Sequence, residues 1–144
     1  MRTVRMLLYA MILGTLFFAP LQSVEIANLK PIQAVWLDVK NGEVFLLTDT
    51  EDSGFGATVD EALADMKHSS SGIVYLDTAQ YLFVSESAEQ KIVAIDPYLK
   101  ASVMLCKWDG QGNIKEAVKY ADSHKIGVKL KCRNNVGKLP EMAL

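Results

Sequence analysis

The chain has 144 residues, of which 50% are hydrophobic and 22% are charged, and its formal net charge is −2. This composition is typical of a globular protein with one domain, and it excludes an intrinsically disordered chain. The slight excess of acid argues against nucleic acids and anionic membrane surfaces as partners, because both are bound through basic patches.

Residues 1–23 have the pattern of a secretory signal peptide. Arg2 and Arg5 precede an uncharged apolar run over residues 6–19, which is shorter than the roughly 20 residues that span a membrane. Cleavage is expected at the end of this segment, and an uncleaved N-terminal anchor is the alternative. Residues 24–30 then form a leader. We therefore expect an exported protein, either extracellular or on the outer face of the cytoplasmic membrane, with no membrane contact beyond this segment.

A β-hairpin is predicted next, with strands Ile32–Val39 and Val44–Thr50. The Asn-Gly dipeptide at 41–42 between them favours a type I′ turn, in which both central residues need positive φ. Lys40 and Glu43 would face each other across this turn.

Trp36 gives the first strand of this hairpin apolar residues on both faces, because Val35 and Leu37 flank it. Either the sheet is covered on both sides or Trp36 is a partly exposed anchor.

A helix is predicted to begin at Thr58, because Thr58 and Glu61 form a T-x-x-E capping box. The apolar residues of this helix recur at helical spacing and predict one buried face, made of Val59, Ala62, Leu63 and Met66. The Ser-rich run at 69–72 ends the helix. Two short strands rich in β-branched and aromatic residues follow, at Ile73–Leu76 and Tyr81–Val84, or one strand interrupted at residues 77–80.

The rest of the chain continues to alternate between helices and strands. Pro97 predicts a break in the first of these helices, and Asn113 is an N-cap for the second. The first of these helices covers Ser87–Leu99, with Ala88, Ile92, Ile95 and Leu99 on one face, and a strand at Ala101–Trp108 follows it. The second helix begins at Asn113 and has an apolar stripe of Ile114, Ala117, Val118 and Ala121. A strand at Val128–Cys132 and a loose tail at 133–144 come last.

This order, ββαββαβαβ, predicts a single α/β domain over residues 31–132. Right-handed crossovers should make its later strands parallel, while the N-terminal hairpin adds an antiparallel portion to a mixed sheet.

The loop between the hairpin and the first helix holds three carboxylates, Asp49, Glu51 and Asp52, which are the ligand type that calcium prefers. The EF-hand pattern fails, because Ser53 occupies the fifth position and Asp60 the twelfth. The failed spacing favours a solvated turn near a helix N-terminus over a metal site.

Other patterns point away from a cofactor or a catalytic centre. Gly54-Phe55-Gly56 stands where a phosphate-binding loop would, but Val59 replaces the third glycine. His68 and His124 lie near predicted helix C-termini, where the helix dipole explains them. The sequence carries no zinc-binding pair spacing and no G-x-S-x-G elbow. We therefore expect no metal, no cofactor and no catalytic residue.

Cys106 and Cys132 are candidates for a disulfide, since each lies near the end of a predicted strand in an exported protein. One helical crossover joins the two strands, so a parallel pairing would bring the cysteines near each other. The alternative is that both are free, buried thiols.

Three segments together resemble the N-terminal domain of the spore germinant receptor C subunits. These are G-A-T-V-D-E-A-L from Gly56, I-V-Y-L-D-T-A-Q-Y-L-F-V-S-E-S-A from Ile73, and D-P-Y-L-K-A-S-V from Asp96. The sequence departs from that family in lacking a lipobox cysteine and in having Asp77 about where a histidine is frequent. The resemblance implies a protein without enzymatic activity that works at the outer face of a membrane.

The function expected from the sequence is therefore binding of a protein or cell-envelope partner outside the cytoplasm, with a link to germination implied by the resemblance. A small-ligand-binding domain is the alternative, which a deep apolar cavity beside Trp36 or Trp108 would favour. A hydrolase would require His68 or His124 to meet a carboxylate and a serine.

Overall fold

The computed structural model describes residues 1–18, 29–135 and 138–143. The expected signal cleavage site and most of the leader lie outside these residues. The strands are β1 (Leu29–Pro31), β2 (Ala34–Lys40), β3 (Glu43–Thr48), β4 (Ser53–Gly56), β5 (Ile73–Tyr75), β6 (Tyr81–Val84), β7 (Met104–Lys107) and β8 (Val128–Lys129). The α-helices are α1 (Arg2–Phe18), α2 (Val59–Ser69), α3 (Ile92–Ile95) and α4 (Ile114–His124). The 3₁₀ segments are η2 (Leu76–Thr78), η3 (Glu86–Lys91), η4 (Asp96–Tyr98) and η5 (Leu130–Asn135).

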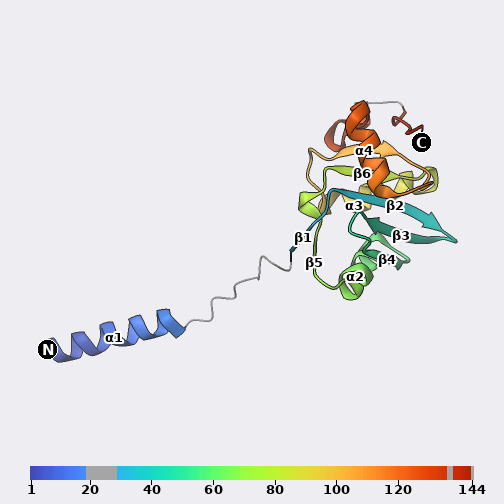
Figure 1. Cartoon of the computed structure of the whole chain (residues 1–144). Coiled ribbons are helices and arrows are strands. Elements are labelled where there is room, and N and C mark those ends of the chain that lie inside the picture. Colours follow the sequence, from blue (N-terminus) through green and yellow to red (C-terminus); the bar gives the residue numbers. More distant parts are fainter. Residues whose placement is uncertain (19–28, 136–137, 144) are drawn as a thin grey trace.

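The main sheet is mixed, with the strand order β4-β3-β2-β6-β7-β8 (Figure 1). Its centre, β2-β6-β7, is parallel, whereas β3 and β4 on one side and β8 on the other are antiparallel to their neighbours. The mixed α/β fold predicted from the sequence is therefore confirmed.

The hairpin of β2 and β3 forms as predicted. Asn41 and Gly42 have φ values of 53° and 83°, the left-handed conformation that a type I′ turn requires, and Lys40 pairs with Glu43. The Asn-Gly dipeptide thus sets the register of the whole hairpin.

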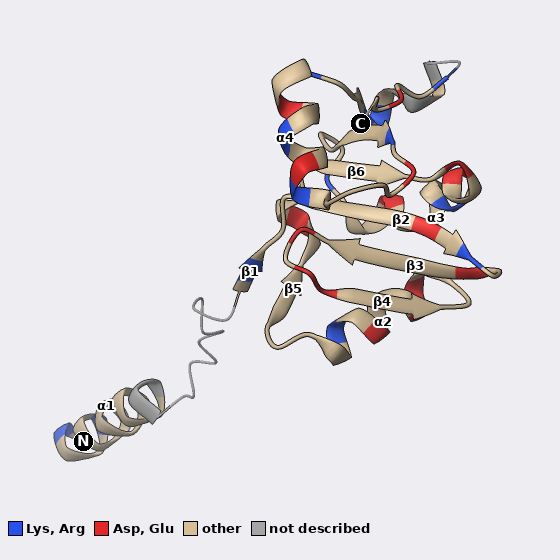
Figure 2. Cartoon of the chain, turned by 45° about the vertical axis from the view of Figure 1, so that its right-hand side comes forward, with Lys and Arg blue, Asp and Glu red and all other residues tan. Residues whose placement is uncertain are grey.

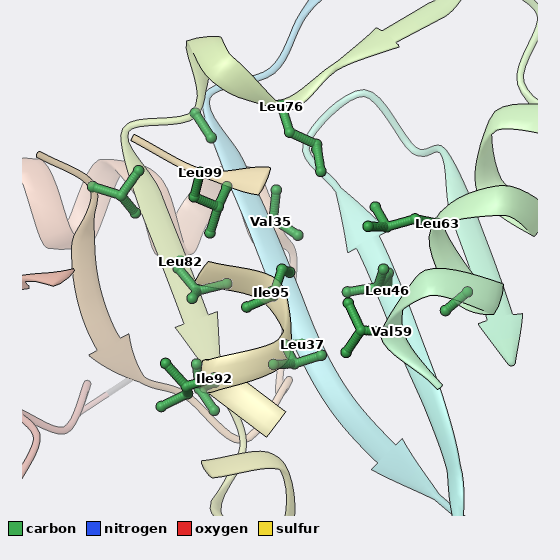
Figure 3. Close-up of a cluster of buried hydrophobic side chains, with 14 of the residues drawn as sticks. Val35, Leu37, Leu46, Val59, Leu63, Leu76, Leu82, Ile92, Ile95 and Leu99 are labelled. Carbon is green, nitrogen blue, oxygen red and sulfur yellow. The ribbon is translucent and has the colours of Figure 1, made fainter. Parts of the chain in front are cut away.

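Apolar side chains cover both faces of the sheet. On one face, Val35 and Leu37 of β2 pack with residues of α2 and α3, which Figure 3 shows in close-up. On the other face, Trp36 packs with Phe83 of β6 under α4. Trp36 is buried, so the interpretation of a sheet covered on both sides is confirmed over β2.

Helix α2 begins and packs as its sequence predicts. The Thr58 hydroxyl accepts a hydrogen bond from the N–H of Glu61, while the Glu61 carboxylate accepts one from the N–H of Ala57 instead of Thr58. The four residues of the predicted stripe are all buried, namely Val59, Ala62, Leu63 and Met66. The helix is therefore fixed to the sheet by the face that its periodicity indicated.

The prediction of one continuous helix at Ser87–Leu99 is wrong. The chain forms η3, then the single turn α3, then η4, because Pro97 has no N–H to continue the α-helical pattern beyond α3. The predicted apolar residues are nevertheless all buried, namely Ala88, Ile92, Ile95 and Leu99.

Strand β8 runs antiparallel to β7, which corrects the parallel pairing expected after one crossover. Lys125 ends α4 in the left-handed conformation, and Gly127 has a φ of 137°. This tight turn leads the chain directly into β8, which is only two residues long before η5 begins.

The two ends of the domain contain pairing that the sequence did not indicate. β1 forms a separate parallel pair with β5. The tail, which was expected to be loose, pairs with the last residue of β7. Lys107 of β7 donates its N–H to the carbonyl of Pro140 at 2.9 Å, and Met142 donates its N–H to the carbonyl of Lys107 at 3.0 Å. The tail therefore extends the edge of the domain at the end of β7.

Helix α1 lies away from the domain (Figure 1), and its described apolar side chains are largely exposed. Within the described ranges, no helix is both long enough and apolar enough to cross a membrane.

Candidate binding cleft

The three carboxylates of the loop that was considered as a calcium site have separate partners. Asp49 Oδ1 accepts hydrogen bonds from the backbone N–H groups of Gln33 (2.9 Å), which precedes β2, and Ala34 (3.2 Å), which begins it. Glu51 is exposed and lies 3.9 Å from Lys115 at the start of α4. Across the described part of the chain, no group of three histidine, cysteine or acidic residues could hold a metal ion. Asp49 therefore has a structural role at the start of the sheet.

Asp52 forms a largely buried ion pair with Lys30, whose Nζ lies 3.2 Å from Asp52 Oδ1. Lys30 Nζ also donates to the Ser71 hydroxyl at 3.0 Å, and Thr50 Oγ1 donates to Asp52 Oδ2 at 2.7 Å. Burial by itself would raise the pKa of Asp52, but the hydrogen bonds and the charge of Lys30 hold it below its usual value. This pair fixes β1 to the loop before β4.

The glycines of the Gly54-Phe55-Gly56 segment serve helix packing. A Cβ added to Gly54 would lie 2.2 Å from the carbonyl oxygen of Ala62, and one added to Gly56 would lie 2.5 Å from the N atom of the same residue. These glycines therefore let α2 lie directly on β4.

The two histidines occupy the last turns of α2 and α4, as the sequence predicted. The ring of His124 stacks on Tyr120 with centroids 4.1 Å apart, and its Nδ1 lies 2.9 Å from the Ser123 hydroxyl. His68 is exposed.

Cys106 and Cys132 are both free, and the parallel pairing behind the predicted disulfide is not formed. Cys106 is buried in β7 and its thiol donates to the carbonyl of Ile126 at 3.3 Å. Burial raises the pKa of this thiol to about 12. Cys132 lies beyond β8, in η5, because the last strand ends at Lys129.

A cleft of about 200 Å³ lies where the parallel strands β6 and β7 end. Its lining comes from the residues that follow these two strands and from the tail that pairs with β7, namely Glu86, Lys107, Trp108, Asp109, Glu141 and Met142. Sheets with parallel strands bind ligands at the carboxyl ends of those strands, so this is the position where a site is expected. The sequence did not indicate this cleft, because the tail that helps to line it was expected to be loose.

Charged groups form the rim of the cleft. Lys107 Nζ lies 2.9 Å from Glu89 Oε1, 3.8 Å from Glu86 Oε1 and 3.9 Å from Glu141 Oε1. The hydrogen bond with Glu89 raises the pKa of Lys107. Glu141 also pairs with Lys138 at 3.1 Å. Figure 2 colours the acidic and basic positions along the ribbon. Of the charged residues that line the cleft, Glu86, Asp109 and Glu141 are acidic and Lys107 is basic.

Two tryptophans lie beneath this rim. Trp108 lines the cleft but is only 3% exposed, and its ring centroid is 5.3 Å from that of Trp36. Neither indole N–H has a hydrogen-bond acceptor among the described residues. A buried donor without an acceptor costs roughly 1–3 kcal/mol, a cost that the packing of the two rings must outweigh.

A small polar cluster positions the rim. Ser85 and Ser87 both donate to Asp38 Oδ1, at 2.6 and 3.2 Å. Because these serines flank Glu86, their bonds hold that residue where β6 passes into η3.

No family model, curated protein or solved structure matches this chain.

Proposed function

We propose that this protein is an exported, non-catalytic binding domain that acts at the outer face of a membrane on a protein or cell-envelope partner. The cleft at the ends of β6 and β7 is the observation that carries this proposal. It combines a charged rim with an aromatic base, and a polar rim around an apolar centre is the usual composition of a binding surface.

Export is supported by the N-terminal segment. Arg2 and Arg5 precede the apolar part of α1, and the described side chains of that part are not covered by the domain. The resemblance of residues 56–103 to the N-terminal domain of germinant receptor C subunits also favours the outer face of a membrane, and a role linked to germination.

A small-ligand-binding domain is the second candidate, because the cleft lies beside Trp108. Sites for drug-sized ligands measure roughly 300–1,000 Å³ and are mainly apolar. This cleft is smaller, at about 200 Å³, and is bordered by charged groups. Its size and charge favour contact with one part of a larger partner.

Two measurements test the proposal. Residues 1–23 fused to a reporter without its own signal should deliver the reporter outside the cytoplasm, and a reporter that stays inside would contradict export. The full chain, purified in detergent, should bind isolated cell envelopes saturably.

Charge reversal at the cleft tests the site. Glu86→Lys should weaken envelope binding severalfold, whereas Glu51→Lys, at the other end of the sheet, should not. Both side chains are more than four-fifths exposed, so neither change should unfold the domain. Equal binding of envelopes by the two variants would exclude the cleft as the binding site.

A further inference from the structure

We propose that the cleft binds a lysine or arginine side chain presented by a peptide segment of the partner. This inference rests on the proposed function and specifies the chemistry of the same site.

The charge balance of the cleft favours a cation. Three acidic residues line it, namely Glu86, Asp109 and Glu141, against one lysine, Lys107. Glu89 and Lys138 are ion-pair partners of Lys107 and Glu141. Among the described acids, only Glu89 lies within hydrogen-bond distance of Lys107 Nζ. Glu86 is 89% exposed and keeps its acceptor capacity. A guanidinium or ammonium group can therefore form charge-assisted hydrogen bonds with this carboxylate.

The base of the cleft suits the aliphatic stem that carries such a cation. Met142 is partly exposed and supplies apolar surface, against which long basic side chains pack their methylene groups. Trp108 also lines the cleft but is only 3% exposed, so its ring adds little contact area. The aromatic layer to which Trp108 belongs already holds one lysine of the chain, since Lys40 Nζ lies 4.2 Å from the ring centroid of Phe45 and 5.2 Å from that of Trp36.

A peptide fits the donors of the cleft better than a free amine does. Lys107 lines the cleft, and among the described acids only Glu89 lies within hydrogen-bond distance of its Nζ, so this ammonium group keeps capacity to donate. A peptide brings backbone carbonyl groups, which are strong acceptors, whereas an ammonium or guanidinium group only donates. The cleft volume of about 200 Å³ also matches one side chain better than a drug-sized molecule.

The experiment is an NMR titration of the ¹⁵N-labelled full chain in detergent with three probes. The probes are the tripeptide Gly-Arg-Gly with blocked ends, the same peptide with citrulline in place of arginine, and spermidine. The indole signal of Trp108 should shift with the arginine peptide and much less with citrulline, which has nearly the same shape without the charge. An equal response to citrulline would overturn the assignment, and equal binding of spermidine would overturn the peptide part.

A double variant tests the residues. Glu86→Gln with Asp109→Asn should lower the binding affinity for the arginine peptide by at least about tenfold, as expected for two lost charge contacts. Glu51→Gln, the matched control, should bind like the wild type, and unchanged binding by the double variant would overturn the inference. If envelopes bind the chain but the arginine peptide does not compete, this inference fails and the proposed function stands. If envelopes do not bind at all, the proposed function itself fails.

Discussion

Gly110 packs directly against the indole ring of Trp36. A Cβ added to Gly110 would lie 2.2 Å from Cζ2 of that ring, and the φ of Gly110 is +84°. The loop that follows β7 therefore packs over Trp36, which itself contacts Trp108 of the cleft, and it can do so only with glycine at this position.

Gly110→Ala should lower the free energy of unfolding by about 1–3 kcal/mol more than Gly112→Ala, which is its matched control. Gly112 lies in the same loop with a φ of +88°, but the nearest atom to its added Cβ is 3.7 Å away. The control therefore carries backbone strain without the clash. Urea denaturation of both variants measures the difference, and equal losses would show that Gly110 does not support Trp36.

Truncation of the core under α2 should be costly. Leu63→Ala removes a buried side chain of the helix and should lower the free energy of unfolding by roughly 2–5 kcal/mol. Lys67→Ala changes an exposed position of the same helix and should stay within about 0.5 kcal/mol of the wild type. Chemical denaturation checks both, and equal midpoints would contradict the packing of α2.

The ion pair of Asp52 and Lys30 should make the free energy of unfolding depend on pH, with a loss of stability at low pH. The pKa of Asp52 is lowered in the folded protein, so its contribution is present above the unfolded pKa of about 3.9 and is lost as the pH falls through the lower folded value. Wild type should therefore exceed Asp52→Asn in stability by a constant amount above about pH 5, and this advantage should shrink below about pH 4. An advantage that persists unchanged to pH 2 would rule out the charged pair.

The two thiols should differ in reactivity. At pH 8 the native protein should expose only Cys132 to a thiol reagent, because Cys106 is buried and its pKa is about 12. Unfolding without reductant should expose both. A count of no thiols in the unfolded, unreduced protein would mean that the two cysteines are bridged.

Local signals predicted the elements that they control. The Asn-Gly turn specifies its own backbone conformation, so the hairpin of β2 and β3 was correct in position and register. The cap at Thr58 and the 3.6-residue periodicity likewise fixed α2, and Asn113 correctly predicted the start of α4.

Features that depend on distant contacts were not predictable in the same way. β1 is three residues long and forms only against β5, more than 40 residues later. The direction of β8 depends on a three-residue turn after α4, whose glycine at 127 packs against Met104 of β7. The cleft needs the tail to meet Lys107. The sequence signal for the cleft was the pair of acidic residues, Glu86 and Asp109, that follow the strands β6 and β7.

Photo-crosslinking in intact cells tests whether the cleft contacts a partner outside the cytoplasm. A photoreactive residue is placed in the full chain at Met142, which lines the cleft, or at Lys119, which is exposed on α4. We predict a discrete adduct from position 142 alone, accessible to protease added outside the cells and suppressed by Glu86→Lys. Adducts of equal yield from both positions, no adduct from position 142, or an adduct sealed inside the cytoplasm would contradict this prediction.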